Sequence, residues 1–286
     1  MRVNSLLYCF LFPLLFTTTS LAWGPVGHQW ISHRALDSLV GKFEVLQVRH
    51  RAELVERSMS ADYRKEQDSE EASRHFVHVE WYGRDLFKDS GMDLDRLVVQ
   101  FGREETRRNG TGPWAAGETF DRLVEAFRRK DLESILSSAA DLSHYIADLH
   151  QPLHTTDNFN GQLTGQPDIH ARFESQLLNR FQSQIVFDRV DAVDSGPVLP
   201  ALFDLVLESH QGLEVLLGAD NRIVSELALD PGAYRKRGSE QNYPERYFTR
   251  MFDEVGGLLE ERLNLAAHRV ASLWWMAWKQ AGEPEF

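Results

Sequence analysis

The amino-acid sequence predicts an all-α protein, a single domain of packed helices. Two observations support this prediction. Apolar residues recur every three or four positions through most of the chain, as they do along the buried face of a helix. The sequence contains no run of alternating apolar and polar residues, which a half-buried strand would produce, and no internal repeat or linker that would divide the chain. Helices packed around one core are therefore the expected architecture.

Residues 1–22 have the pattern of a secretory signal peptide. An early arginine precedes an apolar run, and small residues surround a cleavage point after Ala22. A membrane anchor is the alternative, but the run is shorter than the roughly 20 residues that span a bilayer, and Pro13 interrupts it. We therefore expect a secreted or periplasmic protein that is not an integral membrane protein. Cleavage would leave residues 23–286 as one domain, and two smaller domains are the less favoured alternative.

The composition limits the partners of the mature chain. Its only cysteine, Cys9, lies inside the predicted leader, so the exported protein would contain no disulfide. The formal net charge is −12, and removal of Arg2 with the leader leaves 30 basic against 43 acidic residues, a net charge of −13. Such a chain repels nucleic acids and anionic membranes unless positive charge is supplied locally, and bound metal ions could supply it.

Helical spacing begins with "HQWISHRALDSLV" at His28, and a second helix is expected from about Phe43 to Ser58. The next stretch, Ala61 to Arg74, is charged and shows no apolar period, so it is predicted to be an exposed loop. Helical patterns resume from Asp93 to Arg108 and stop at "NG", a common helix terminator.

Two further helices are predicted from Trp114 to Arg129 and from Leu132 to His150. The second begins behind Asp131 as an N-cap and ends before Pro152, because a proline disfavours helical backbone in the residue before it. A loop rich in Gly, Asn and Thr then leads into "IHARFESQLLNRF", whose apolar residues recur every four positions.

The last two helices are expected from Leu199 to Gly218 and from Pro244 to Gly282. The turn-prone segment "LDPGAYRKRGSEQNYP" separates them. The chain therefore reads as helix almost from the predicted amino terminus to its end.

The stretch "HYIADLHQPLH", residues 144–154, predicts metal ligands. His144 and Asp148 are four residues apart on one helix face, and His170 and Glu174 repeat this spacing on the next helix. One such pair often forms only an exposed hydrogen bond, but two pairs flank His154, which follows the break at a proline. Imidazole and carboxylate ligands suit zinc, and the lack of thiolates favours a hydrolytic site over a structural one.

Other histidines divide into candidates and bystanders. Asp62, His75 and His78 offer further ligands upstream, and His28 lies five residues after the expected amino terminus. His150 is predicted to face outward, because it lies off the face that carries His144. The remaining histidines are expected to be ordinary surface or core residues: His33, His50, His210 and His268.

Five motifs in order, "W....H", "AD", "RHF", "HYIAD..QPLH" and "HARFE", resemble those of the zinc-dependent phospholipase C and P1 nuclease superfamily. This resemblance covers the mature chain to about Phe181 and implies an exported all-α enzyme with three zinc ions. It implies a first zinc on Asp62, His75, His144 and Asp148, and a second on His154, His170 and Glu174. It implies a third zinc on the amino group and carbonyl of Trp23, on His28, and on Asp148 as a bridging carboxylate.

The resemblance also implies hydrolysis of a phosphodiester by zinc-activated water. Three zinc ions carry +6, whereas Asp62, Asp148 and Glu174 return −3, so an anionic substrate would meet a positive pocket. Zinc lowers the pKa of bound water to about 7, and no nucleophilic Ser or Cys is needed. Lys65 matches a basic position of the nucleases and would help neutralise the transition state; a solvated charge is the alternative reading. We expect a monomer without a stable protein partner.

The sequence features that bear on the substrate are divided between two branches of the superfamily. The short span from His154 to His170, Glu174 in place of an aspartate, the missing disulfides and Tyr63 resemble the phospholipases. The short spacing in "WGPVGH" resembles the nucleases, and Val26 replaces an acid of the choline site. His78 stands where the nucleases have the base-binding aspartate.

The candidate substrate residues are Tyr63, Phe76 and His78. A phospholipase C-like hydrolase is slightly preferred. The alternatives are a single-strand nuclease or 3'-nucleotidase, and a zinc-binding protein without turnover.

Overall fold

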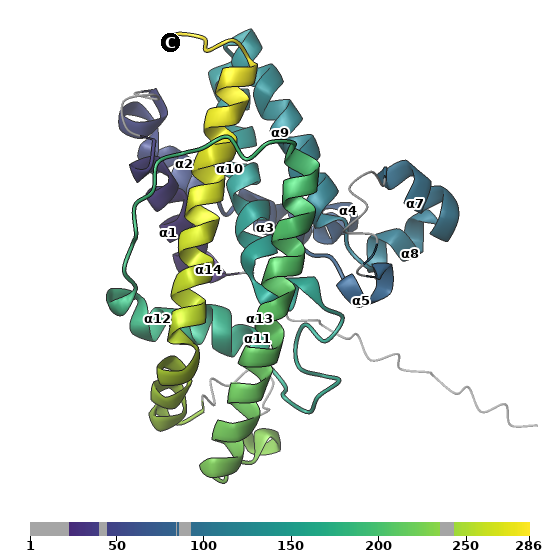
Figure 1. The fold of residues 1–286 in the computed structure, drawn as a ribbon, viewed down its shortest axis with the longest axis vertical. Helices are drawn as coiled ribbons and strands as arrows, with labels where there is room; N and C mark the ends of the chain where they lie inside the picture. The colour runs from purple at the N-terminus through teal and green to yellow at the C-terminus, as the bar shows by residue number, and fades with distance from the viewer. Residues whose placement is uncertain (1–22, 40–44, 84, 86–92, 235–242) are drawn as a thin grey trace, which may run out of the picture.

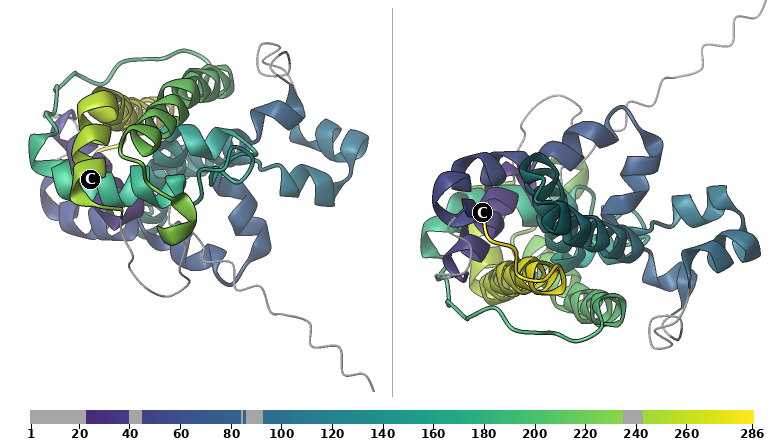
Figure 2. Two further views of the ribbon diagram at one scale, coloured as in Figure 1. Left: turned by 90° about the horizontal axis from the view of Figure 1, so that it is seen from below. Right: turned by 90° about the horizontal axis from the view of Figure 1, so that it is seen from above.

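The computed structural model describes residues 23–39, 45–83, 85, 93–234 and 243–286. Within these ranges the chain forms helices, turns and irregular segments and contains no β-strand, which confirms the all-α prediction. Most helices pack into one bundle, while α5, α7 and α8 project from one side of it (Figures 1 and 2). The predicted signal peptide lies outside the described residues.

The bundle is built around α10, Leu132–His150. This helix begins as predicted, because the Asp131 carboxylate accepts a hydrogen bond from the Ser134 backbone N–H at 3.2 Å. From Ser138 to its end every residue is buried, so α10 has no solvent face there. The helices that surround α10 are α1 (Gly24–Asp37), α2 (Arg51–Arg57), α9 (Gly112–Arg129), α13 (Val198–Glu226) and α14 (Glu245–Gln280).

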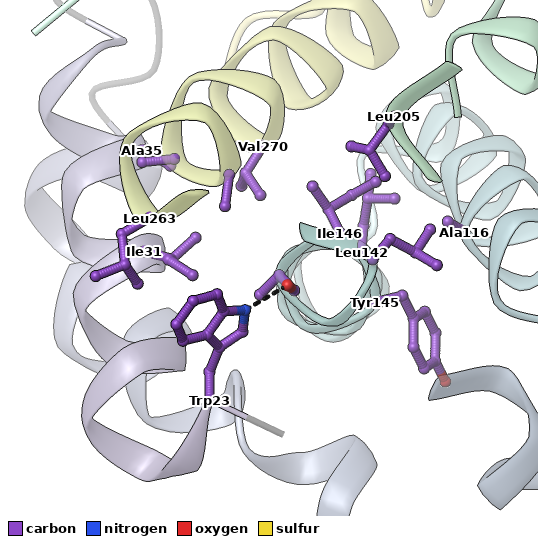
Figure 3. Close-up of a cluster of buried hydrophobic side chains, with 14 of the residues drawn as sticks. Trp23, Ile31, Ala35, Ala116, Leu142, Tyr145, Ile146, Leu205, Leu263 and Val270 are labelled. Carbon is purple, nitrogen blue, oxygen red and sulfur yellow. Dashed lines mark hydrogen bonds between the residues drawn. The ribbon is translucent and has the colours of Figure 1, made fainter. Parts of the chain in front are cut away.

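The core is apolar along most of α10 and joins it to the start of α1. Figure 3 shows Ile31 of α1 and Val270 of α14 on one side of α10, with Leu205 of α13 on the other. Trp23 is fully buried in this core, and its indole N–H donates to the carbonyl of Ala147 at 2.6 Å. The large ring and its satisfied polar atom together fix the start of α1 against α10.

Two of the predicted helices are divided into shorter elements in the structure. The expected second helix is a π-helical turn, η1, followed by α2, and the segment before Asn109 divides at Gly102 into α7 and α8. Residues 185–197 run along α14. The backbone N–H of Asp188 donates to the side-chain oxygen of Asn264, a residue of α14, at 3.0 Å. The remaining bounds are η1 Val45–Arg49, α5 Val79–Tyr82, α7 Leu94–Phe101, α8 Arg103–Arg108, α12 Leu178–Phe181, η5 Gln182–Gln184 and η6 Pro231–Tyr234.

One predicted loop is wrong. The stretch from Ala61 to Arg74 is mostly helical, in α3 (Ser60–Lys65), α4 (Ser69–Ala72) and the start of η2 (Ser73–His75). It shows no apolar period because several of the side chains that it buries are polar, among them Asp62 and Glu71. A pattern search for apolar faces therefore cannot detect it.

The prediction that His150 faces outward is also wrong. His150 is fully buried, since α10 is surrounded at this end, and its Nδ1 lies 2.8 Å from the Ile146 carbonyl, to which it donates. The Arg269 guanidinium donates to its Nε2 at 3.0 Å. Burial and the nearby Arg269 hold the pKa of His150 well below its usual value, so the ring stays neutral.

Among the described helices, none combines the length and the apolarity that spanning a bilayer requires.

Gly110 provides a test of how the η2 segment is held. Its φ is +81°, and a Cβ there would lie 2.2 Å from the Phe76 carbonyl oxygen, whereas Gly102 has φ +87° and open space around it. Gly102→Ala should therefore lower the free energy of unfolding by about 1 kcal/mol through backbone strain alone. Gly110→Ala should lower it by about 3 kcal/mol or more, because the backbone beside His75 must also move. Equal losses in urea unfolding would contradict this packing.

Candidate metal centre

The predicted side-chain ligands converge from seven elements. Asp62 comes from α3, His75 from η2, and His144 and Asp148 from the C-terminal half of α10. His154 lies in η3, Pro152–Thr155, directly after α10. His28 lies in α1. The remaining two, His170 and Glu174, lie in α11 (Ile169–Ala171) and η4 (Arg172–Leu177).

Asp148 lies between two sets of histidines. Its Oδ2 is 2.8 Å from His75 Nδ1 and 3.4 Å from His144 Nε2, and its Oδ1 is 3.4 Å from His28 Nε2. His28 and His144 stack with ring centroids 3.9 Å apart. One carboxylate thus presents its two oxygens to different imidazoles, which is the arrangement that a bridging ligand requires.

Asp62 completes the cluster on the other side. Its Oδ1 is 3.5 Å from His144 Nε2 and 3.8 Å from His75 Nδ1, and the Lys65 ammonium pairs with the same oxygen. Two groups of possible metal ligands result, each with its donor atoms within 4.8 Å of one another. They share His144 and consist of His28, His144 and Asp148, and of Asp62, His75 and His144.

A third group consists of His154, His170 and Glu174. His154 Nε2 and His170 Nε2 are 3.0 Å apart, and the Glu174 Oε2 is 2.8 Å from His170 Nε2. Glu174 belongs to a π-helical turn, which has more residues per turn than an α-helix and brings residues four apart closer to the same face. The spacing of His170 and Glu174 therefore predicted this pairing correctly.

Backbone carbonyls orient two of the imidazoles. His144 Nδ1 donates to the Ser58 carbonyl at 2.6 Å, and His154 Nδ1 donates to the His75 carbonyl at 2.7 Å. In the neutral ring each contact keeps the proton on Nδ1, so that the lone pair of Nε2 is directed into its group. Ligand histidines in metal sites are commonly fixed in this way.

Trp23 lies beside the third group. Its backbone N–H donates to Glu174 Oε2 at 3.1 Å, and its carbonyl accepts from the Gly27 N–H at 3.1 Å. Its φ of +47° is unusual for a residue with a side chain. The indole is buried in the core, and the expected chelation of an ion by a free Trp23 amino group stays a prediction.

The donor set fits metal ions. Both ring nitrogens of His28, Oδ2 of Asp62, Oδ1 of Asp148 and Nδ1 of His170 are buried without a hydrogen bond. Buried polar atoms are normally paired, so such a concentration in one place indicates a ligand. Three carboxylates, Asp62, Asp148 and Glu174, are also fully buried, and they need compensating positive charge. Three buried groups could therefore hold metal ions.

A proton on one imidazole compensates part of this charge. Burial lowers the pKa of His28 to about 3 and that of His154 to about 4. Burial also opposes a charge on His144, but Asp148 and Asp62 outweigh it and raise the pKa of His144 to about 10. The same histidine holds the pKa of Asp148 well below its usual value against the effect of burial.

The candidate substrate residues lie in different surroundings. Tyr63 is 61% exposed, and Lys65 has a nearly buried ammonium against Asp62, so the solvated reading of Lys65 is wrong. Phe76 and His78 lie with ring centroids 4.9 Å apart. His78 is parallel to the Phe159 ring at 6.5 Å, and Phe159 is 6.4 Å from the His170 ring.

Sequence reasoning missed three residues around the centre. Phe159 lies in the polar loop after His154, and Glu71 is one of several acidic residues in a charged stretch, so neither was selected as a candidate. His210 contacts the residue after His154 by a hydrogen bond of 3.1 Å between its Nδ1 and the Thr155 hydroxyl. A bulky aromatic in a loop of Gly and Asn was the one signal available.

Comparison with models of known protein families and with curated proteins finds no match for this chain.

Asp148→Asn should remove more metal than any other single ligand change. The carboxylate faces His28 on one side and His75 and His144 on the other, so its loss should weaken two ions at once. We expect metal analysis to show a loss of more than one zinc per chain, together with loss of any phosphodiester turnover. Asp141→Asn is the matched control, because Asp141 is a buried acid of the same helix that pairs with Arg64 instead. Normal zinc in Asp148→Asn but reduced zinc in Asp141→Asn would move the bridge to Asp141.

An added glycine before Trp23 separates the chelate from simple packing. An amide nitrogen has its lone pair delocalised into the peptide bond, so it cannot replace a free amine as a metal ligand. The chain that begins at Gly-Trp23 should therefore lose about one zinc and its activity relative to the chain that begins at Trp23. Trp23→Ala does not distinguish the two explanations, because it also leaves a cavity in the core. Equal zinc content and equal rates for the two amino termini would refute the chelate.

Proposed function

We propose that this protein is a zinc-dependent phosphodiester hydrolase that uses activated water. The observation that carries the proposal is the convergence of three buried ligand groups, with Asp148 presented to two of them. A single structural ion would need only one closed set of about four ligands. Several adjoining groups instead suit an ion cluster that can hold a nucleophile and a leaving oxygen together.

Zinc ions, when bound, would supply Lewis acidity and lower the pKa of water so that it can attack phosphorus. The residues of the chain would position the ions and stabilise the charge of the substrate. Asp62, Asp148 and Glu174 would hold the ions, and the carbonyls of Ser58 and His75 keep the His144 and His154 rings in one tautomer. Lys65 places a buried positive charge beside Asp62, where it would stabilise negative charge on the phosphoryl oxygens.

Phospholipids and nucleic acids are the two candidate substrates. The sequence slightly favours a phospholipase C, through Glu174, the short span between His154 and His170, and Tyr63. A choline headgroup would be bound by cation–π contact, and Tyr63 is exposed enough to provide one.

The aromatic group of Phe76, His78 and Phe159 favours the nuclease alternative. Phe159 adjoins His170, and the parallel orientation of His78 and Phe159, 3° between ring planes, offers faces on which a base can stack. A phospholipid offers no aromatic base for such a surface. Each branch therefore has its own aromatic residue, Tyr63 or Phe159, and the two can be tested separately.

Metal removal tests the hydrolase proposal. The mature protein should hold about three zinc ions, lose all phosphodiester turnover in excess chelator and regain it on addition of zinc, because the ligands are nitrogen and oxygen donors. At most one zinc per chain in active protein would exclude the three-ion cluster. Bound zinc without turnover of any phosphodiester would leave a zinc-binding protein.

A substrate panel with two variants separates the branches. Phosphatidylcholine vesicles, single-stranded DNA and a 3'-nucleotide would be compared for the zinc-loaded wild type, Tyr63→Ala and Phe159→Ala. A phospholipase should prefer the vesicles and lose activity mainly in Tyr63→Ala. A nuclease should prefer DNA or the nucleotide and lose about tenfold or more in Phe159→Ala, since base stacking contributes about 1–3 kcal/mol.

A further inference from the structure

The far side of His75 faces a second buried carboxylate. His75 directs Nδ1 toward Asp148 and Asp62, so its Nε2 points away from the candidate metal positions. That Nε2 is buried, makes no hydrogen bond and lies 3.7 Å from Glu71 Oε1. His144 and His154 instead donate from their outer nitrogen, Nδ1, to neutral backbone carbonyls.

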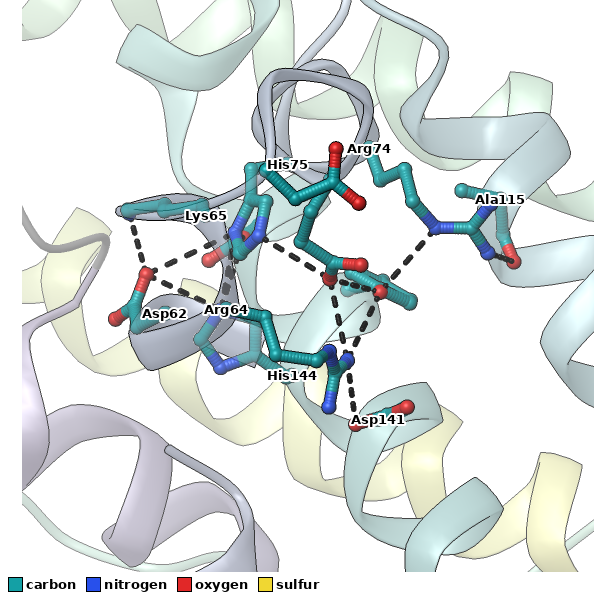
Figure 4. A network of polar contacts seen from close by, with 12 residues as sticks. Asp62, Arg64, Lys65, Arg74, His75, Ala115, Asp141 and His144 are labelled. Atoms are coloured by element: carbon teal, nitrogen blue, oxygen red, sulfur yellow. Dashed lines mark hydrogen bonds and ion pairs between the residues drawn. The ribbon is translucent and has the colours of Figure 1, made fainter. Parts of the chain in front are cut away.

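Glu71 is itself held from several sides. The Tyr145 hydroxyl donates to Glu71 Oε1, and the Arg64 guanidinium donates to the same oxygen at 3.2 Å. Arg64 is fixed in turn by Asp141 at 3.0 Å, and Arg74 donates to the Tyr145 hydroxyl at 3.3 Å. Figure 4 shows this network beside His75, with Asp62 and Lys65 on the opposite side of the ring. The carboxylate therefore has a defined place next to the imidazole.

We infer that Glu71 is a positioning residue for His75, which it orients and makes a stronger metal donor through the outer ring nitrogen. The inference rests on the proposed zinc site. A carboxylate beside the outer N–H of a ligand histidine fixes the tautomer and raises the basicity of the other nitrogen. The predicted ligand that Glu71 faces is His75, so its effect should be largest on the ion that His75 binds.

A purely structural role is the competing explanation. Glu71 could be retained only because it pairs with Arg64 inside the fold. Removal of the charge has different effects in the two cases. If the role is structural, the change lowers the free energy of unfolding of metal-free protein. If Glu71 positions His75, the change lowers metal affinity at one site.

Glu71→Gln, in the full mature chain, separates the roles. Glutamine keeps the size of the side chain and its hydrogen bonds to Tyr145 and Arg64, but it removes the charge beside His75. We expect one zinc to bind 10–100-fold more weakly in competition with a chelator, as loss of such outer contacts typically gives, while the other ions keep wild-type affinity. In cobalt-substituted protein, the same variant should show a changed absorption spectrum for one bound ion.

Glu70→Gln is the matched control, because Glu70 is the neighbouring acid of α4, is exposed and pairs with Arg107. It should bind every zinc as the wild type does. Glu71→Asp retains the charge and should recover part of the lost affinity. Thermal unfolding in excess chelator shows whether the metal-free variants fold alike.

Wild-type affinity for every ion in Glu71→Gln would overturn the inference, and so would weaker binding that appears equally in Glu70→Gln. The result is independent of catalysis: a wild type that binds zinc but hydrolyses nothing would overturn the proposed hydrolase and leave the role of Glu71 standing.

Discussion

Three fully buried carboxylates, Asp62, Asp148 and Glu174, impose the strongest constraint on this fold. An ionised carboxylate loses several kcal/mol of solvation when it is buried, and this loss must be offset by nearby positive charge or by hydrogen bonds. The Lys65 ammonium and a proton on His144 compensate part of the charge. The unpaired oxygens and ring nitrogens that remain are the groups that metal ions would satisfy.

The apolar core makes this polar cluster possible. α10 is buried on all sides from Ser138, and one end of the helix carries both apolar residues such as Ile146 and the ligands His144 and Asp148. Packing of α1, α9, α13 and α14 around α10 provides the hydrophobic stabilisation that the cluster itself does not. The other ligands, except His28 of α1, lie in short elements, including η2, η3 and the π-helical turn η4.

The sequence predicted the regular part of the fold well. α9 and α10 match their predicted ranges within two residues, because apolar spacing, the Asp131 cap and Pro152 each leave a local signal. The pairs His144–Asp148 and His170–Glu174 were equally accessible, since a separation of four residues places two side chains on one helix face. These features depend on positions that are close in the sequence.

The remaining features depend on contacts between distant segments. The stretch from Ala61 to Arg74 resembled a solvated loop because it buries Asp62 and Glu71, and only the approach of α10 reveals that burial. His150 was assigned to the surface from its position on one helix, although Arg269, more than a hundred residues later, covers it. No local pattern distinguishes Glu71 from its neighbour Glu70, so their different surroundings appear only in the folded chain.

Trp23 links the core to the candidate site. Its indole is fixed by the core and by Ala147, while its backbone N–H reaches Glu174, so the same residue belongs to both. Metal bound only by the folded chain would stabilise that fold in proportion to its affinity. Ligands that lie so near core contacts would therefore make metal loss and loosening of α1 occur together, and the cluster would be a structural support of the bundle as well as its reactive centre.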